Sequence, residues 1–360
     1  MRSVRPDNRK FNTLLITGFV VALAAALVAE AGIKRTASGK PDFSGTYDVA
    51  TLTPLERPED FGDNLYLTKD EADEIVKRQQ DRVSERSQVS DPNREAPPDG
   101  GDGSPGAAGN VGGYNNFWLD VGTDTFSVGG KFRTSIIVEP KNGRMPPMTD
   151  MGTARLAKLF AGFRRENDGT AWWLDQEGPG PYDNMEQRHT AERCLLGFTG
   201  AAPTFPSAYN NFKRIVQTDD HVMILIEMVH DARIVRMNSE HVPANEKKWL
   251  GDSIGWWEED TLVVDTTNFH PLAGRRGSSP ENHVVERFTM QDDGNILYRF
   301  TVDDPSIWTE SWTGEYIWKA DEGRVYEYAC HEGNYALGNI MRGARILERD
   351  LLAGESESSD

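Results

Sequence analysis

The sequence predicts a mainly β protein in which an antiparallel meander closes into a barrel. The segment from His221 to His331 carries most of this signal, because short stretches rich in Val, Ile, Thr, Tyr, Phe and Trp alternate there with Asp, Gly, Asn and Pro. Within Asn295–Val302 apolar residues recur at every second position, which is typical of a strand with one buried face. No helical pattern interrupts the meander. A long open sheet leaves unpaired edges, so a meander of this length either closes into a barrel or folds over as a sandwich, and we expect the barrel.

The N-terminus, residues 1–31, has the pattern of a signal peptide. A basic start is followed by an apolar run from Leu14 to Ala29 and by the small-residue cleavage pattern Ala29-Glu30-Ala31. An uncleaved single membrane anchor is the alternative, because the apolar run could cross a membrane with some tilt. Either interpretation places the body of the protein outside the cytoplasm, in the periplasm or secreted, and predicts no other membrane contact.

After a linker at residues 32–40, we expect a single barrel-like domain over residues 41–345. Its first strand lies in Pro41–Asp48, and a helix begins after Thr68, because Thr68 and Glu71 have the spacing of a capping box.

Three further segments are expected to lie outside the barrel wall. Residues 84–113 are rich in Pro, Gly, Asp and Ser and predict a flexible loop, or alternatively a lid. Residues 141–215 are expected to form a helix and irregular cover, and residues 346–360 an acidic disordered tail.

Charge and cysteine content limit the partners and the compartment. The formal net charge is −18, which argues against nucleic acid, since nucleic-acid binders need a basic surface. The only two cysteines are Cys194 and Cys330, and in an exported protein such a pair is most simply a disulfide. A nucleophilic Cys330 next to His331 is the less favoured alternative.

Long motifs in the chain resemble those of a family of exported, β-rich bacterial proteins that have no assigned activity. The resemblance covers residues 41–345 and implies export, but no catalytic role. The Phe43-Ser-Gly-Thr-Tyr47 opening is similar to the first strand of lipocalin-like, calycin-type barrels. The motifs that carry the family resemblance are Glu227–Arg233, Trp256–Phe269, His283–Phe288, Thr301–Pro305 and Tyr326–Tyr335.

The first candidate catalytic residues lie on one expected strand, Val222–Val235. His230 would lie on the apolar face of this strand, where it is either a core residue with satisfied hydrogen bonds or an acid–base group lining the barrel lumen. Glu227, Asp231 and Arg233 would share the other face, as a buried ion network or as a polar site.

Two more histidines complete the candidate catalytic set. His283 follows a loop rich in hydrogen-bond donors, and His331 lies in the dense polar run after Cys330. The candidate substrate-binding residues are Tyr335, Asn334, Arg276, Trp257 and Asn211. We expect no metal and no cofactor, because the sequence has no metal-ligand spacing and no nucleotide-binding loop.

Two functions remain open. The first is a cofactor-independent enzyme of the lyase, isomerase or hydrolase type. It would act on a small organic or glycan-derived substrate by histidine–carboxylate acid–base chemistry in a barrel pocket. The alternative is a periplasmic lipocalin-like protein that binds a small apolar or glycan-like ligand. The number of titratable groups favours the enzyme, whereas the lack of a recognisable nucleophile favours the binding protein.

Overall fold

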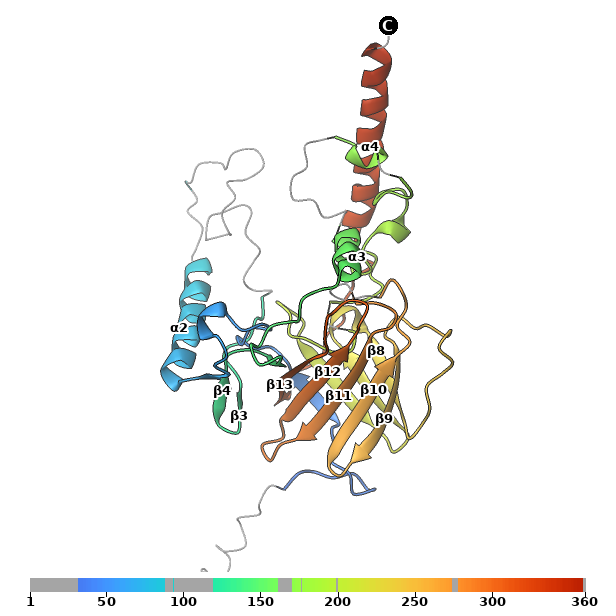
Figure 1. Cartoon of the computed structure of the whole chain (residues 1–360). Coiled ribbons are helices and arrows are strands. Elements are labelled where there is room, and N and C mark those ends of the chain that lie inside the picture. The colour runs from blue at the N-terminus through green and yellow to red at the C-terminus, as the bar shows by residue number, and fades with distance from the viewer. Residues whose placement is uncertain are drawn as a thin grey trace, which may run out of the picture.

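The computed structural model describes residues 32–87, 93, 119–160, 170–175, 177–198, 200–273 and 278–358. Within these residues nine strands form a closed wall, because β13 pairs with both β12 and β1 (Figure 1). This mainly β architecture fits the calycin-like class of barrels and confirms the predicted fold class. Around the wall the strands are β1 (Gly45–Asp48), β6 (Phe212–Gln217), β7 (His221–Ile226), β8 (Ala232–Met237), β9 (Asp252–Glu258), β10 (Thr261–Thr267), β11 (His283–Met290), β12 (Ile296–Asp303) and β13 (Trp312–Asp321).

One strand pair departs from the antiparallel expectation. β8 and β9 are parallel, with Val235 opposite Ser253, whereas the other pairs around the wall are antiparallel. Parallel neighbours need a crossover connection instead of a tight turn. Residues 238–251 form that connection and return the chain to the end of the barrel where β8 began. The turn residues that predict hairpins in the sequence do not predict a crossover of this kind.

The inner face of the wall is filled by large side chains. On β12 the residues Ile296, Tyr298, Phe300 and Val302 are buried, as the period of two predicted. The Tyr298 ring lies 4.9 Å from that of Trp318 on β13, so the rings pack across neighbouring strands. These inward rings are at most 1 % exposed (Phe288, Tyr298, Phe300, Tyr316 and Trp318). The barrel centre is therefore a packed core.

A short segment, residues 201–205, packs into one end of this core. Its residues are all buried, and the Phe205 ring meets that of Phe300 edge-on at 5.4 Å. The backbone of Thr204 is held twice: its N–H donates to the Tyr298 hydroxyl at 3.1 Å, and its carbonyl accepts from the Tyr316 hydroxyl at 2.9 Å. The segment thereby closes that end of the barrel.

The remaining helices and strands lie outside the closed wall. α2 (Lys69–Arg86) has the predicted capping box of Thr68 and Glu71. A small sheet combines β2 (Tyr66–Leu67), β4 (Lys131–Arg133) and β3 (Ser127–Val128), and β5 (Ile137–Glu139) extends β13. α3 (Asp150–Phe160) and α4 (Tyr335–Ser358) stand above one end of the barrel (Figure 1).

Two expected segments differ in the structure. The expected linker is tied to the barrel, because Arg35 forms a two-pronged ion pair with Asp260 at 2.5 and 2.8 Å. The expected disordered tail is wrong for residues 346–358, which continue α4. Contacts that sequence periodicity does not reveal support this helix: Trp173 donates from Nε1 to Glu348 at 2.7 Å, and Ala344 packs beside it. Most of the expected flexible loop at 84–113, and the signal segment 1–31, lie outside the described residues.

The predicted disulfide between Cys194 and Cys330 is present and joins residues 136 positions apart. The alternative of a free nucleophilic cysteine is thereby excluded. Among the helices that the structure describes, none combines the length and apolar character needed to span a membrane.

Candidate functional site

The expected strand Val222–Val235 is in fact a hairpin. β7 ends at Ile226, a 3-10 turn covers Met228–His230, and β8 begins at Ala232. Val229 and His230 have φ values of 62° and 44°, in the left-handed region that a β-branched residue rarely adopts. The turn places His230 at the surface, so both expectations for it, a core residue and a group lining the lumen, are wrong.

The three charged residues expected on the opposite face are buried but do not form one cluster. Arg233 points into the barrel and pairs with Glu286 through both its terminal nitrogens, one of them at 2.9 Å. The Tyr298 hydroxyl also donates to Glu286, at 2.6 Å. Burial raises the pKa of Tyr298 well above its usual value and keeps this donor protonated. Arg233 is 2 % exposed and Glu286 0 %, so this pair is a structural part of the core.

Glu227 and Asp231 secure the chain around the hairpin. The Glu227 carboxylate accepts the N–H of Phe212 at 3.3 Å, and that of Asp231 accepts the N–H of Gly197 at 2.9 Å. Burial raises the pKa of Asp231 to about 6, against the weaker opposing effects of Gly197, His230 and Lys213. Both side chains thus hold backbone segments together.

The remaining candidate, His283, belongs to a hydrogen-bonded chain of two histidines and two aspartates on the outer face of the barrel. The Nε2 atom of His283 lies 2.9 Å from one carboxylate oxygen of Asp265, and Nε2 of His241 lies 3.0 Å from the other. Nδ1 of His241 then lies 3.0 Å from Asp252. An ionised carboxylate only accepts, so Nε2 of His283 is the donor in its bond to Asp265. We call this group the His–Asp chain.

Three neighbouring strands and one crossover bring the His–Asp chain together. Asp252 begins β9, Asp265 lies on β10 opposite Ile254 and Val285, and His283 begins β11. His241 comes from the crossover 238–251. The alternation of β10 places Asp265 on the outer face, since Val264 and Thr266 on either side are completely buried.

One end of the His–Asp chain is buried and the other is open to solvent. The Asp252 side chain is 1 % exposed, that of His241 25 % and that of His283 41 %. At the buried end Asp252 also accepts from Arg236 at 2.8 Å and from Lys248 at 2.5 Å. At the open end, Nδ1 of His283 makes no hydrogen bond within the described part of the chain. This nitrogen can therefore meet a molecule from solvent.

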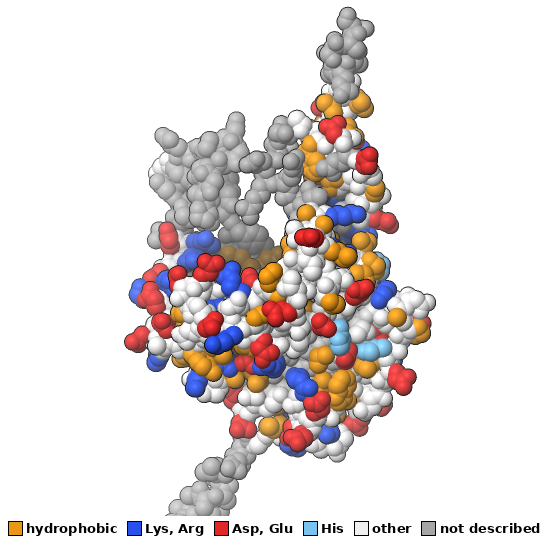
Figure 2. Space-filling model, in the orientation of Figure 1, with side chains coloured by type: hydrophobic (Ala, Val, Ile, Leu, Met, Phe, Trp, Pro, Cys, Tyr) orange, Lys and Arg blue, Asp and Glu red, His pale blue; other side chains and the backbone are white. Residues whose placement is uncertain are grey.

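The electrostatics of the chain favour a protonated His283. Its hydrogen bond to Asp265 raises its pKa above 6.5, more strongly than partial burial lowers it, and the charges of Asp265 and Asp303 add to the rise. Burial alone would raise the pKa of Asp252, but hydrogen bonds from Lys248, His241 and the Val242 N–H lower it to about 2. The pKa of Asp265 is also lowered, since its two imidazole partners outweigh burial. The fixed carboxylates therefore favour the protonated form of His283, whose side chain is 41 % exposed. Figure 2 shows that histidine side chains are exposed on this view of the molecule.

The other predicted site residues lie apart from the His–Asp chain. His331 is in an exposed turn, and Tyr335 is 77 % exposed at the start of α4. Asn334 lines a pocket beside the disulfide. Arg276 lies outside the described residues.

Two further predicted binding residues make contacts within the protein. Asn211 is 1 % exposed and its amide donates to the carbonyls of Asp120 and Ser207, which excludes a role in binding solvent-borne ligands. Trp257 stacks on Phe43 with a centroid distance of 5.8 Å.

Three members of the His–Asp chain were missing from the predicted site. The sequence contained a signal for Asp265, because this acidic residue directly follows the apolar run Leu262–Val264 within the strand and lies at an outward position. His241 and Asp252 carry no comparable local signal, since their meeting depends on the crossover. Within the described residues, no group of three or more His, Cys, Asp or Glu side chains is placed to hold a metal ion.

Fold and site together define a calycin-like β-barrel with a histidine–aspartate chain on its outer wall. In comparisons with known proteins, no family model matches the chain, and no curated protein and no solved structure is significantly similar to it. The resemblance to exported bacterial proteins stays a prediction.

Proposed function

We propose that the protein is an exported enzyme that performs acid–base chemistry on a small organic or glycan-derived substrate, as a lyase, isomerase or hydrolase. His283 exchanges a proton with the substrate through Nδ1, and Asp265 orients the ring through Nε2. Export is supported by the disulfide and by the basic and apolar N-terminal pattern.

The observation that carries this proposal is the position of His283 at the open end of the His–Asp chain. The raised pKa favours the protonated imidazole, which can donate a proton to a leaving group or a developing oxyanion. The bond from Nε2 to Asp265 fixes the ring and directs Nδ1 outward. His241 and Asp252 in turn fix the other oxygen of Asp265. The site requires no cofactor for this step.

The alternative, a lipocalin-like carrier, finds less support in the barrel centre. A carrier of that kind holds its ligand inside the barrel, whereas here large aromatic side chains occupy the interior with at most 1 % exposure. A ligand would have to bind elsewhere on the molecule.

The test uses the secreted protein and a panel of oligosaccharides, aryl esters, aryl glycosides and small hydroxy acids, with mass spectrometry to detect transformed products. We expect the wild type to transform at least one panel compound, and His283→Gln to reduce that rate by about 10²–10⁴-fold, the usual contribution of a general acid. The melting temperature should stay within a few degrees. His221→Gln is the matched control, since His221 is an exposed histidine that begins β7.

Asp265→Asn distinguishes a catalytic from a structural role. It should shift the acidic or basic limb of the pH–rate profile together with the pKa of His283. Full activity of His283→Gln would refute the assignment. Compounds that bind but return unchanged would favour the binding-protein alternative.

A further inference from the structure

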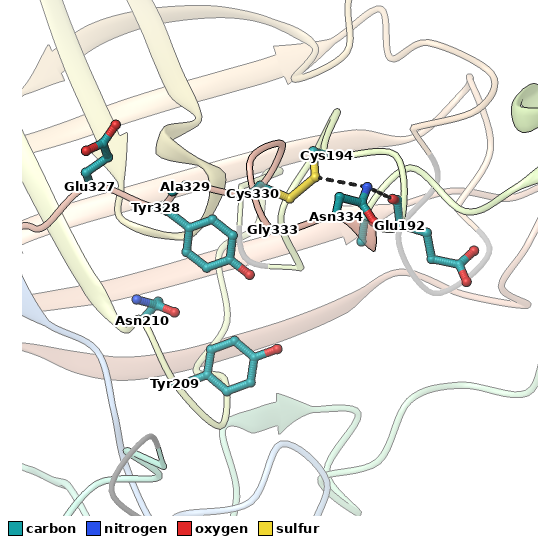
Figure 3. A pocket seen from close by; sticks show the side chains of 11 residues that line it. Glu192, Cys194, Tyr209, Asn210, Glu327, Tyr328, Ala329, Cys330, Gly333 and Asn334 are labelled. Atoms are coloured by element: carbon teal, nitrogen blue, oxygen red, sulfur yellow. Dashed lines mark hydrogen bonds between the residues drawn. A yellow bond between two sulfur atoms is a disulfide. The ribbon is translucent and has the colours of Figure 1, made fainter. Parts of the chain in front are cut away.

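The pocket beside the disulfide is bounded by residues that hold the chain together. The bond between Cys194 and Cys330 joins its two walls, and the amide of Asn334 donates to the carbonyl of Glu192 at 2.7 Å (Figure 3). The side-chain oxygen of Asn334 also accepts from the Leu337 N–H at 3.3 Å, so this residue positions the start of α4. These residues are therefore part of the framework of the protein.

A second pocket, of about 470 Å³, adjoins the segment that leads into His283. This volume is within the range of small-molecule sites. Glu281 lines the pocket and precedes His283 by two residues, which span at most about 7 Å. On the paired strand β12, Asp303 lies opposite His283, and Ser306, three residues later, also lines the pocket. The pocket therefore lies beyond the same end of β11 and β12 at which His283 is found.

The helix α3 forms the other wall of this pocket. Its lining residues recur three and four positions apart, so they share one face of the helix. The hydroxyl of Thr149, the residue before α3, donates to the Ser306 carbonyl at 2.6 Å and fixes the first turn of the helix at the Ser306 end. Arg155 fixes the middle, because its guanidinium donates to the carbonyls of Ser278, at 3.0 Å, and of Pro271. The lining residues of α3 are Met151, Ala154, Arg155 and Lys158.

The carboxylate and the ammonium group of the pocket lie at its two ends. Glu281 accepts from the Ser306 hydroxyl at 2.5 Å, near the first turn of α3. Lys158 lies seven residues beyond Met151, which is about 10 Å along the helix axis. The Lys158 side chain is exposed, and its ammonium group makes no hydrogen bond or ion pair with any residue that the structure describes. Lys158 is therefore a cation that a ligand can reach, at the end away from Glu281.

Between these ends the surface of the pocket is mainly apolar. Met151 is 63 % exposed, Ala154 is exposed and Pro280 on the facing wall is half-buried. These side chains carry no group that requires a hydrogen bond, and a methionine side chain adapts its shape to an apolar neighbour. The pocket thus offers an apolar surface that leads from a free ammonium group to the segment before His283.

We propose that this pocket binds the substrate of the reaction at His283, and that the substrate is a small carboxylic acid with an apolar body. The carboxylate pairs with Lys158 through a charge-assisted hydrogen bond, and the apolar body lies on Met151 and Pro280. The reacting end then extends past Glu281 to His283. This inference rests on the proposed function, because it names the substrate class for the acid–base chemistry of the same site.

The proposal is tested by isothermal titration of the full chain with 3-phenylpropionate. Its neutral amide, 3-phenylpropionamide, and the cation 3-phenylpropylamine are the matched probes. We expect the acid to bind with a Kd in the millimolar range or tighter, about tenfold or more below the Kd of the amide, and the amine not to bind. Lys158→Met keeps the alkyl chain and removes the charge, so it should raise the Kd of the acid by about fivefold or more.

Two further variants of lysine sharpen the test. Lys158→Glu reverses the charge and should make the amine bind more tightly than the acid. Lys141→Met is the matched control, because it changes the net charge equally at a side chain that is 83 % exposed and outside the pocket lining. It should leave the Kd of the acid unchanged. Absence of binding by the acid, equal Kd values for acid and amide, or an unaffected Kd in Lys158→Met would overturn the proposal.

NMR of the histidine side chains tests the connection to the reaction. Addition of 3-phenylpropionate should shift the imidazole signals of His283 and leave those of the exposed His221 unchanged. Binding without a shift at His283 would overturn the substrate role of the pocket. Full activity of His283→Gln in the turnover assay would refute the reaction itself, and the substrate role with it. A loss of turnover in His283→Gln together with no binding of the acid would refute only the assignment of the pocket.

Discussion

Replacing Asp231 by asparagine should stabilise the protein at neutral pH and remove part of its pH dependence. Asp231 is 8 % exposed, and burial raises its pKa to about 6 from an ordinary value of 3.8. Asparagine has nearly the same shape and can still accept the Gly197 N–H that Asp231 accepts at 2.9 Å. The substitution therefore removes the charge and retains the contact.

The expected magnitude follows from proton linkage. A carboxyl group whose pKa is raised on folding contributes its full stabilising effect below pH 3.8, where it is protonated in both states. That contribution is lost as the pH rises through about 6. A difference of about two pKa units corresponds to about 3 kcal/mol, at about 1.4 kcal/mol per unit, and is an upper value. Asp231→Asn should thus exceed the wild type by up to about 3 kcal/mol at pH 7.

Urea unfolding followed by tryptophan fluorescence, at intervals between pH 3.5 and 7.5, measures this difference. The gap between the two curves should be close to zero at the acidic end and should widen through pH 6. Asp292→Asn is the matched control, because it changes the net charge equally at an exposed position between β11 and β12. Parallel curves for the wild type and Asp231→Asn would refute the argument.

Three further outcomes are expected. Glu286→Leu should lower the free energy of unfolding by about 3–5 kcal/mol, because it leaves Arg233 buried without a counter-ion. Adding Arg233→Met should restore much of this loss. A loss below about 1 kcal/mol in urea unfolding would contradict the expectation. Removing the disulfide by reductant or by serine at both positions should cost about 4–5 kcal/mol, since it releases a constraint across 136 residues. An unchanged melting temperature under reductant would be incompatible with that estimate. NMR titration of the His283 imidazole should give a pKa above 6.5, and this pKa should fall in the Asp265→Asn variant. The stabilising effect of the protonated imidazole is present below pH 6.5 and is lost as the pH rises through the raised pKa. An identical titration in Asp265→Asn would exclude the coupling.

Local patterns predicted those parts of the fold that depend on near neighbours. The period of two in β12 identifies its buried face because each side chain alternates between core and surface regardless of the partner strand. The capping box at Thr68 is equally local, since its hydrogen bonds span three residues.

The same reasoning failed where a turn had no recognisable sequence signal. Residues 227–231 contain no glycine, proline or asparagine, and in the sequence the alternation of the two strand faces continues through them without a break. In the structure the chain reverses there, with Val229 in the left-handed region, and the parity of inward positions changes. Ile234 is consequently 48 % exposed while Arg233 is buried. The predicted site around His230 is wrong for this reason, because the reversal changes which residues face inward.

By itself the sequence determined a mainly β barrel, the disulfide of its only two cysteines and His283 as a residue to inspect. Only the tertiary structure decided that His241, Asp252 and Asp265 join His283, because a parallel crossover and the pairing of three strands bring them together. Likewise, only packing determined that Arg233 and Glu286 meet inside the barrel. Periodicity reports the face on which a side chain lies, whereas the identity of its neighbours is set by strand order and register across long separations in the chain.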